Sequence, residues 1–263
     1  MGLGVEHVTA RIDGAIGWLT IERPEARNAL NAAVFAGLEH HVQALAADPA
    51  VRVVIVAGAG GRAFSAGADV DELRHLSGVD ARSLLMRGQR VFRQIETLGV
   101  PTIAAVRGWA LGGGFELALS CSMIVAGESA RFGLPESGLG LMPGYGGTQR
   151  LTRVVGPKIA LTAMLTGQPL DAQRAWEVGL LARPPVADDA VEAVAEELAR
   201  VVASRSPSAV RLILESVDAA GPPESGLRHE TALAALAVSS PDAAEGVAAF
   251  LEKRQPNFEA RSR

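Results

Sequence analysis

The sequence predicts an α/β fold in which strands and helices alternate, followed by a region built of helices alone. Short continuous apolar runs, typical of fully buried strands, recur along the chain and are followed by segments of helical character. After about residue 185 no further strand pattern occurs. The chain has 263 residues, 48% of them apolar, which suits one large domain or one domain with an appendage.

The first fifty residues predict a β-hairpin followed by a helix. β-branched residues flank Asp13-Gly14, a dipeptide that favours tight hairpin turns. From Asn31 onward apolar residues recur at helical spacing, and Asp48-Pro49 stops the pattern. The residues of this apolar face are Val34, Leu38, Val42 and Leu45.

Three apolar runs predict buried strands of one sheet. They read VRVVIVAG over 51–58, PTIAAVRG over 101–108 and CSMIVAG over 121–127. A polar stretch over about 82–97 predicts a helix between the first two. A glycine-rich loop follows each of the first two runs, and a helix is expected after the second loop.

The C-terminal part predicts only helices. Residues 187–205 have a helical pattern, and Ser206-Pro207 and Ser240-Pro241 each predict an N-cap followed by proline in the first turn. Gly221-Pro222-Pro223 separates two of these helices. We therefore divide the chain into a mixed core over residues 1–195 and a helical region over 196–263.

Composition excludes several classes of function. A net charge of −4 and no Lys/Arg-rich segment argue against nucleic-acid binding. No run of eighteen apolar residues and no signal-peptide pattern is present, so we expect no membrane association. A single cysteine, Cys121, indicates a reducing compartment, and a cytoplasmic location is expected. The five histidines lack metal-ligand spacing, so no metal site is predicted.

Three familiar motif classes are disfavoured. The stretch GAGGRA over 58–63 matches a dinucleotide-binding pattern, but FSAGAD intervenes before the next predicted helix. No second strand ending in an acidic residue follows about twenty residues later, as that pattern requires. The chain also lacks the G-x-S-x-G nucleophile elbow of hydrolases and the phosphate-binding loop of nucleoside triphosphatases.

Two glycine-containing loops are the strongest candidates for chemistry. FSAGAD, over 64–69, and LGGGFE, over 111–116, each follow a buried strand and precede a predicted helix. Glycine lets a backbone approach a ligand closely, and helix N-termini present unpaired N–H groups. Side by side, two such loops can aim two N–H groups at one oxygen and form an oxyanion hole. Taken singly, each loop is equally well explained as a tight turn.

Two glutamates lie near these loops in sequence. Glu116 comes one turn into the helix that follows the glycines, and Glu136 lies in the Gly/Pro-rich segment over 131–147. Burial of an unpaired carboxylate is costly and moves its pKa toward neutrality, which suits acid–base chemistry. Ordinary capping or ion-pairing roles for the two residues remain an equal alternative.

Several long motifs, in order, resemble the enoyl-CoA hydratase/isomerase (crotonase) family over nearly the whole chain. They are RPEARNALN, AFSAGADVDEL, PTIAAVRGWALGGGFELALSC, RFGLPESGLGLMPGYGGTQRL, LTGQPLDAQRAWEVGLL and SPDAAEGVAAFLEKRQPNF. The resemblance implies a spiral of ββα units and a C-terminal helical region that packs homotrimers, often paired into hexamers. It implies an acyl-CoA substrate of the kind met in fatty acid metabolism. Coenzyme A is then part of the substrate, and no separate cofactor is expected.

The resemblance also assigns roles. The backbone N–H groups of Ala68 and Gly113 correspond to the family's oxyanion hole. Glu116 resembles the residue that orients and deprotonates a water attacking the β-carbon of a trans-2-enoyl thioester, and Glu136 the residue that protonates the α-carbon. Retention of both glutamates favours hydration or its reverse. Isomerisation or biosynthetic dehydration of a specialised acyl-CoA is the main alternative, and a non-catalytic binding role is a third.

The remaining assignments concern coenzyme A and the acyl group. The backbone near Ala66 resembles the adenine-binding segment, while Arg27 and Lys253 resemble basic residues near the phosphates and the nucleotide end. Either charge is equally explained as a solvated surface group. Candidates for the acyl pocket, each with core packing as its alternative, are Trp109, Phe115, Leu134, Met142 and Tyr145. Ser122 stands where the family usually has Asp, a change from which we expect little loss of catalysis and a looser packing around the active-site helix.

Overall fold

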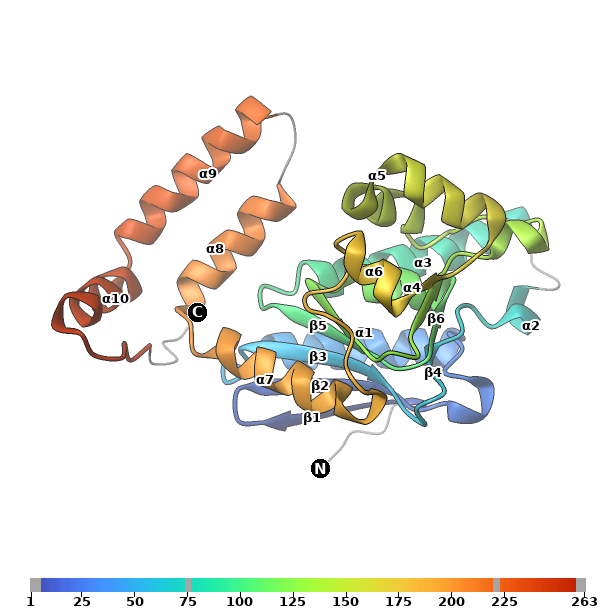
Figure 1. Cartoon of the computed structure of the whole chain (residues 1–263), viewed down its shortest axis with the longest axis horizontal. Coiled ribbons are helices and arrows are strands. Elements are labelled where there is room, and N and C mark those ends of the chain that lie inside the picture. The colour runs from blue at the N-terminus through green and yellow to red at the C-terminus, as the bar shows by residue number, and fades with distance from the viewer. Residues whose placement is uncertain (1–5, 74–76, 220–222, 259–263) are drawn as a thin grey trace.

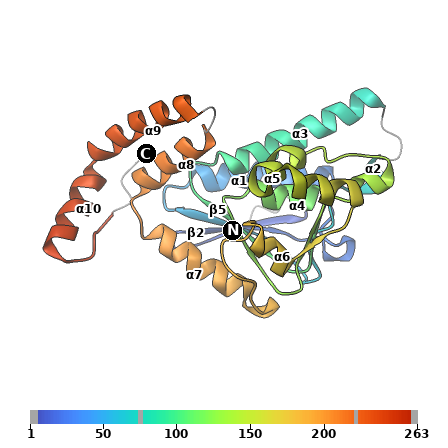
Figure 2. The same cartoon turned by 45° about the horizontal axis from the view of Figure 1, so that its top comes forward.

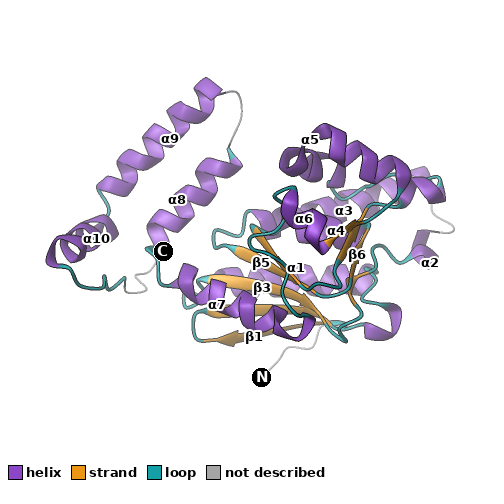
Figure 3. Ribbon diagram, in the orientation of Figure 1, coloured by secondary structure: helices purple, strands orange, loops and turns teal. Residues whose placement is uncertain are grey.

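Two β-sheets with helices packed around them form the body of the chain (Figure 1). The computed structural model describes residues 6–73, 77–219 and 223–258. Gly221 and Pro222, which belong to the predicted break between helices, lie outside the described residues. Figure 3 shows the strands gathered at the centre and the last helices standing to one side.

The larger sheet has five strands in the order β1-β2-β3-β5-β7. Their bounds are Val8–Asp13, Ile16–Ile21, Val53–Gly58, Thr102–Val106 and Met123–Ala126. β1 and β2 pair antiparallel across a turn in which Gly14 has a φ of 58°, and the remaining pairs are parallel. The predicted hairpin and the three predicted buried strands are confirmed.

A smaller sheet of four strands, in the order β4-β6-β8-β9, lies beside the larger one. Its strands are Ala63–Ser65, Trp109–Leu111, Arg131–Gly133 and Leu170–Asp171. The first turn of chain, β1-β2-α1, places both strands in the larger sheet. Later turns place a strand in the larger sheet, then one in the smaller, then a helix, as in β5-β6-α4 and β7-β8-α5. This repetition is the ββα spiral that the resemblance implied. The short strands carry too few residues for an alternating pattern, so the sequence did not reveal them.

Ten α-helices and three 3₁₀ segments are found in the described residues. The helices of the body are α1 Ala32–Ala47, α2 Val70–Leu73, α3 Gly78–Glu96, α4 Gly113–Ser120, α5 Gly147–Thr166, α6 Ala172–Glu177 and α7 Val191–Ala203. The last three are α8 Pro207–Asp218, α9 Pro223–Val238 and α10 Pro241–Glu252. The 3₁₀ segments are η1 Pro24–Ala26, η2 Glu136–Leu139 and η3 Asp188–Ala190.

Side-chain caps explain where several helices begin. The side chain of Asn31 accepts the N–H of Val34 at 2.9 Å and starts α1. Ser77 caps α3, which therefore begins at Gly78 instead of Arg82. The caps predicted at residues 206 and 240 are confirmed, because both serine side chains accept N–H groups of the following first turn.

The core lies on both faces of the central part of the larger sheet, which is why β3 carries no polar side chain and is buried throughout. On β3, Val54 and Val56 face a cluster that includes side chains of α1 and α3. Val53 and Ile55 face a second cluster closed by α7. Burial on both faces removes the alternation of an exposed strand and produces a continuous apolar run.

The last three helices stand apart from the body, as Figures 1 and 2 both show. Residue 195 lies inside α7, whose buried side chains pack on the larger sheet, so the separate helical region begins after α7, at Pro207. Large apolar side chains on these helices are exposed: Ile213, Val217, Leu227, Leu236, Val238, Val247, Phe250 and Leu251. Among the described helices, none combines the length and apolar character needed to cross a membrane.

Candidate active site

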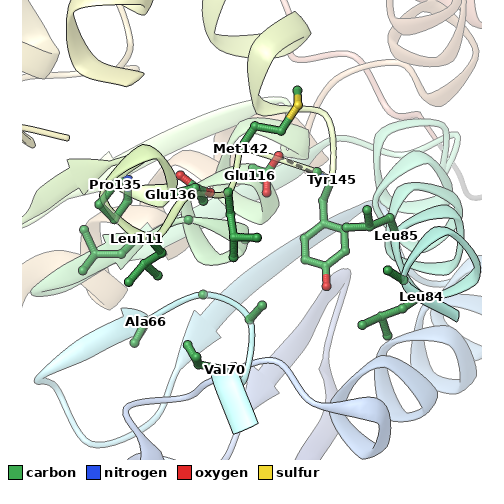
Figure 4. A pocket seen from close by; sticks show the side chains of 18 of the residues that line it. Ala66, Val70, Leu84, Leu85, Leu111, Glu116, Pro135, Glu136, Met142 and Tyr145 are labelled. Atoms are coloured by element: carbon green, nitrogen blue, oxygen red, sulfur yellow. Dashed lines mark hydrogen bonds between the residues drawn. The ribbon is translucent and has the colours of Figure 1, made fainter. Parts of the chain in front are cut away.

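A cavity of about 710 Å³ opens between α3, α4 and the loops that precede α2 and α5 (Figure 4). Its lining is largely apolar. The four residues assigned to the oxyanion hole and to acid–base chemistry line it together: Ala68, Gly113, Glu116 and Glu136. Concave apolar cavities with a few converging polar groups are the usual form of small-molecule sites.

The two glycine-containing loops touch each other at this cavity. Gly67 has a φ of 96°, and a Cβ there would lie 2.7 Å from the carbonyl oxygen of Leu111 and 3.3 Å from the N of Gly113. The main chain of Leu30 fixes the first loop, since its N–H donates to Gly67 O at 2.8 Å and its carbonyl accepts from Asp69 at 3.0 Å. Only glycine at position 67 allows this backbone-to-backbone approach.

Two N–H groups remain unpaired where the loops meet. Among the described residues, neither Ala68 nor Gly113 donates its N–H to a protein acceptor. Gly113 is the first residue of α4, where an N–H has no intrahelical acceptor and the helix dipole presents its positive end. Both residues line the cavity, so an oxygen that develops negative charge there would find donors already in place.

At each of the three consecutive glycines a different physical reason excludes a side chain. Gly112 precedes α4 with φ 49° and ψ −127°, a conformation that disfavours a side chain. A Cβ at Gly113 would lie 2.9 Å from the ring of Tyr145. A Cβ at Gly114 would lie 2.3 Å from the carbonyl oxygen of Ser65. The glycines therefore let α4 start against both the first loop and an aromatic ring.

Glu116 is buried and anchored. The residue is 1% exposed, and its Oε1 accepts the N–H of Tyr145 at 2.8 Å and of Gly147 at 2.7 Å. Burial raises the pKa of this carboxyl group, while the two N–H donors and the charge of Arg150 oppose the rise. One carboxylate oxygen is thus fixed by the loop before α5, on the wall of the cavity.

Glu136 opens η2 on the neighbouring wall of the cavity (Figure 4). Its Oε2 is buried and has no hydrogen-bond partner among the described residues. Burial raises the pKa of Glu136 to about 7, and the nearby charge of Glu116 acts in the same direction. A carboxyl group with this pKa exchanges a proton readily near neutral pH.

Arg150, on α5, holds the loop that anchors Glu116. Its Nη1 donates to the carbonyl oxygen of Tyr145 at 2.8 Å, and its Nε and Nη2 donate to Glu96 of α3 at 3.2 and 3.1 Å. Sequence reasoning missed this residue, although it lies in the quoted GGTQRL segment. Its role depends on Glu96, which is distant in sequence, so no local pattern indicates it.

Two of the five acyl-pocket candidates line the cavity, Met142 and Tyr145. Phe115 and Leu134 are instead fully buried in the main core, where Phe115 packs against Phe132. Trp109 is 44% exposed on β6 and is not among the lining residues. α4 turns the side chain of Phe115 into the core because the adjacent Glu116 occupies the side of the helix that faces the cavity.

The candidates for binding the nucleotide part lie in two places. Ala66 lines the main cavity, and its N–H donates to the carbonyl oxygen of Arg27 at 2.9 Å. Arg27 and Arg62 line a second cavity of about 240 Å³. Lys253 ends α10 in an exposed position, and within one chain α10 lies away from the main cavity (Figure 1).

Ser122 and Cys121 are not among the residues that line the cavity. Ser122 lies between α4 and β7, where its N–H donates to Thr102 Oγ1 at 2.9 Å. Cys121 is buried and free, as expected of a small apolar side chain. Within the described part of the chain, no group of His, Cys, Asp and Glu side chains has an arrangement that could hold a metal ion.

Comparison with known proteins identifies relatives over almost the entire length. Residues 11–261 match the family described as enoyl-CoA hydratase/isomerase. The chain is 38% identical over 258 residues to crotonyl-CoA hydratase of Syntrophomonas wolfei, covering 97% of this chain and 99% of that protein. It is 40% identical over 245 residues to 2,3-dehydroadipyl-CoA hydratase of Escherichia coli, covering 92% and 94%. Among solved structures, enoyl-CoA hydratase from Bacillus anthracis superposes with a TM-score of 0.92 at 34% identity, covering 97% of this chain and 100% of that one.

Proposed function

The chain belongs to the enoyl-CoA hydratase/isomerase family, and we propose that it catalyses the reversible hydration of a trans-2-enoyl-CoA thioester to a 3-hydroxyacyl-CoA. Enoyl-CoA hydration follows at the level of the family, whereas the roles of individual residues are our own proposal. One observation supports these roles. Two carboxyl groups with raised pKa values share a cavity with two unpaired backbone N–H groups.

The N–H groups of Ala68 and Gly113 bind the thioester carbonyl oxygen. Attack on the β-carbon moves electron density onto this oxygen and gives an enolate-like intermediate. Donors aligned in advance stabilise such charge, and loss of one donor in a comparable site costs about 3–4 kcal/mol. The contact between Gly67 and the main chain at 111–113 supports this role, because it fixes the spacing of the two donors.

Glu116 acts as the base and Glu136 as the acid. Glu116 accepts a proton from a water molecule while the water oxygen forms a bond to the β-carbon. Glu136 gives its proton to the α-carbon, and the π bond is consumed. Transfer of the water-derived proton from Glu116 to Glu136 restores the enzyme, so the net change is addition of one water molecule. The pKa values support this division, since Glu136 has a pKa raised to about 7, while two N–H donors on Glu116 favour its ionised form.

The coenzyme A part is expected to leave the cavity past Ala66. The N–H of Ala66 is already bonded to Arg27, so the backbone here links the main cavity to the second one. Arg27 and Arg62 would then face phosphate groups, which suits guanidinium chemistry. Lys253 follows α10, which lies away from α3 and α4 of its own chain (Figure 1), so we assign this residue to the site of another subunit in a trimer or hexamer.

Double-bond isomerisation is the second candidate reaction, because two neighbouring carboxyl groups can also carry a proton between two carbons of an acyl group. Biosynthetic dehydration is the same chemistry as hydration run in reverse. For either case the donor pair and the two glutamates would keep the same positions.

We also retain a cytoplasmic location as a prediction, based on the single, buried and free Cys121.

The test follows loss of the conjugated enoyl thioester by ultraviolet absorbance, with crotonyl-CoA as substrate and product analysis by mass spectrometry. We expect hydration by the wild type and losses of about 10²–10⁴ in kcat for Glu116→Gln and Glu136→Gln. Glu128→Gln, which changes an exposed carboxylate, is the matched control. Near-normal turnover in either glutamine variant would refute its role, and a shifted double bond without added water would establish isomerisation.

A further inference from the structure

We propose that Tyr145, seated against Gly88, is the specificity-determining residue that limits how far an acyl group can enter the cavity, and that the preferred acyl groups are short and uncharged. The proposal rests on the proposed function, because it concerns the acyl end of the same site. It follows from where the ring lies, what holds it there and what surrounds it.

The ring of Tyr145 is held rigidly from behind. The residue is 3% exposed and still lines the cavity. Its ring meets Phe35 edge-on at a centroid distance of 5.3 Å and Phe92 at 5.6 Å. Aromatic pairs at such distances stabilise one orientation. The ring therefore forms a rigid side of the cavity, since any rotation would disturb its two buried aromatic neighbours.

Two glycines make room for the ring. A Cβ at Gly88 on α3 would lie 2.3 and 2.4 Å from ring carbons of Tyr145, and a Cβ at Gly113 on α4 would lie 2.9 Å from the opposite edge. The ring thus fills a slot between the two helices. Removal of the ring would extend the cavity into this slot, toward Phe35 and Phe92.

The slot lies at the acyl end of the cavity. With the thioester oxygen at Ala68 and Gly113, the coenzyme A part leaves past Ala66. In Figure 4, Ala66 lies toward one end of the cavity, whereas Tyr145 lies toward the other end with Leu84 and Leu85. An acyl chain directed away from coenzyme A therefore meets the ring of Tyr145.

The side chains that line the cavity disfavour acyl groups that carry a charge. The described residues that line the cavity include no basic side chain, and Glu116 and Glu136 supply its only acidic ones. An acyl group that ends in a carboxylate would face apolar side chains and two carboxyl groups, with no counter-ion among these residues. An uncharged alkyl end avoids this cost.

No hydrogen bond of the Tyr145 hydroxyl is found among the described residues. Both hydrogen bonds of Tyr145 in the site use its main chain, at the N–H and the carbonyl oxygen. Tyr145→Phe therefore keeps the ring and both main-chain contacts, whereas Tyr145→Ala keeps the main-chain contacts and removes the ring together with its packing against Phe35 and Phe92. The two substitutions separate the volume of the ring from its polarity.

The experiment compares kcat/KM for trans-2-butenoyl-, trans-2-octenoyl- and 2,3-dehydroadipyl-CoA. For Tyr145→Ala we expect the octenoyl-to-butenoyl ratio to rise by about tenfold or more, within the range that a few methylene groups command in an apolar pocket. For Tyr145→Phe the ratio should stay within about threefold of the wild type. The dehydroadipyl substrate should remain the poorest of the three for the wild type. An unchanged ratio in Tyr145→Ala, or a dehydroadipyl preference, would overturn the proposal.

Binding of saturated analogues tests the same point without turnover. Calorimetry with butyryl-CoA and octanoyl-CoA should show the preference shift toward octanoyl in Tyr145→Ala and, to a smaller extent, in Tyr145→Leu. Gly88→Ala pushes the ring toward the cavity and should weaken octanoyl binding, while Gly88→Ala/Tyr145→Ala should recover it. A shifted binding preference without any hydration would contradict the proposed function alone. Hydration with unchanged binding preferences would contradict this inference alone.

Discussion

The Oε1 atom of Glu116 accepts the backbone N–H of Gly147 at 2.7 Å, so a buried carboxylate of α4 is fixed by the first residue of α5. The catalytic orientation that we propose for Glu116 therefore depends on the loop between η2 and α5. Because the same cavity also holds Glu136, the stability and the activity of the chain are linked through these two carboxyl groups.

Glu136→Gln is expected to lower the activity and to raise the stability of the folded chain. The folded chain holds this carboxyl with a pKa of about 7 against an ordinary value of 4.5, so ionisation of Glu136 opposes folding at higher pH. The amide removes that cost, and we expect a gain of about 1 kcal/mol, or roughly 2–4 °C in Tm, at pH 8. The gain should shrink as the pH falls from 8 to 5, where the folded carboxyl is protonated but the unfolded one, with its ordinary pKa of 4.5, is still partly ionised, and it should vanish below that unfolded pKa. Thermal unfolding at the two pH values checks this, and a lower Tm at pH 8 would contradict it.

The pH dependence of kcat/KM reports the pKa of the group that donates the proton in the free enzyme. If Glu136 donates a proton to the α-carbon, the free enzyme needs it protonated, and kcat/KM should fall as the pH rises through about 7. The profile is measured with crotonyl-CoA from pH 5.5 to 9. Glu128→Gln should keep the profile, whereas the residual activity of Glu136→Gln should lose this descending limb. A wild-type rate that rises through pH 7 would assign the acid to another group.

Gly67→Ala should separate the two N–H donors. Its Cβ would lie 2.7 Å from Leu111 O, and its φ of 96° disfavours a side chain, so the loops must move apart. We expect kcat to fall by about 10²-fold or more, as for the loss of one oxyanion-hole donor. Gly61→Ala is the matched control, because Gly61 has a φ of 71° and no atom within 4 Å of its built Cβ. An equal loss in both variants would indicate backbone strain alone.

Arg150→Lys should weaken the anchoring of Glu116. Lysine cannot bridge Tyr145 O and both oxygens of Glu96 together, as the guanidinium does. We expect a loss of about 1–3 kcal/mol in stability together with a kcat reduced more than KM is raised. Denaturant unfolding and steady-state kinetics measure the two effects. Arg174→Lys, on the exposed side of α6, serves as control, and unchanged kinetics in Arg150→Lys would remove its positioning role.

Phe250→Asp should disrupt the proposed assembly of subunits. Phe250 is 83% exposed on α10, within the apolar surface of the last three helices, and burial of such surface normally drives association. Light scattering should show a trimer or hexamer for the wild type and smaller species for the variant. Ile12→Asp, at a 44% exposed position on β1, is the control. A monomeric wild type would contradict the oligomer proposal.

The sequence by itself determined the elements whose causes are local. The turn at Asp13-Gly14, the helix that follows Asn31 and the buried strands follow from backbone preferences and apolar periodicity within a few residues, and the structure confirms them. The two glycine-containing loops and both glutamates were also evident, because flexible and charged residues are unusual within apolar sequence.

Tertiary structure alone decided the rest. Nothing local indicates that Tyr145 fills the slot beside Gly88, that Arg150 reaches Glu96, or that Phe115 points into the core while Lys253 follows α10, away from α3 and α4 of its own chain. The short strands of the smaller sheet exist only because they pair with one another. These features depend on contacts between residues distant in sequence, whose free energy appears only once the chain has packed.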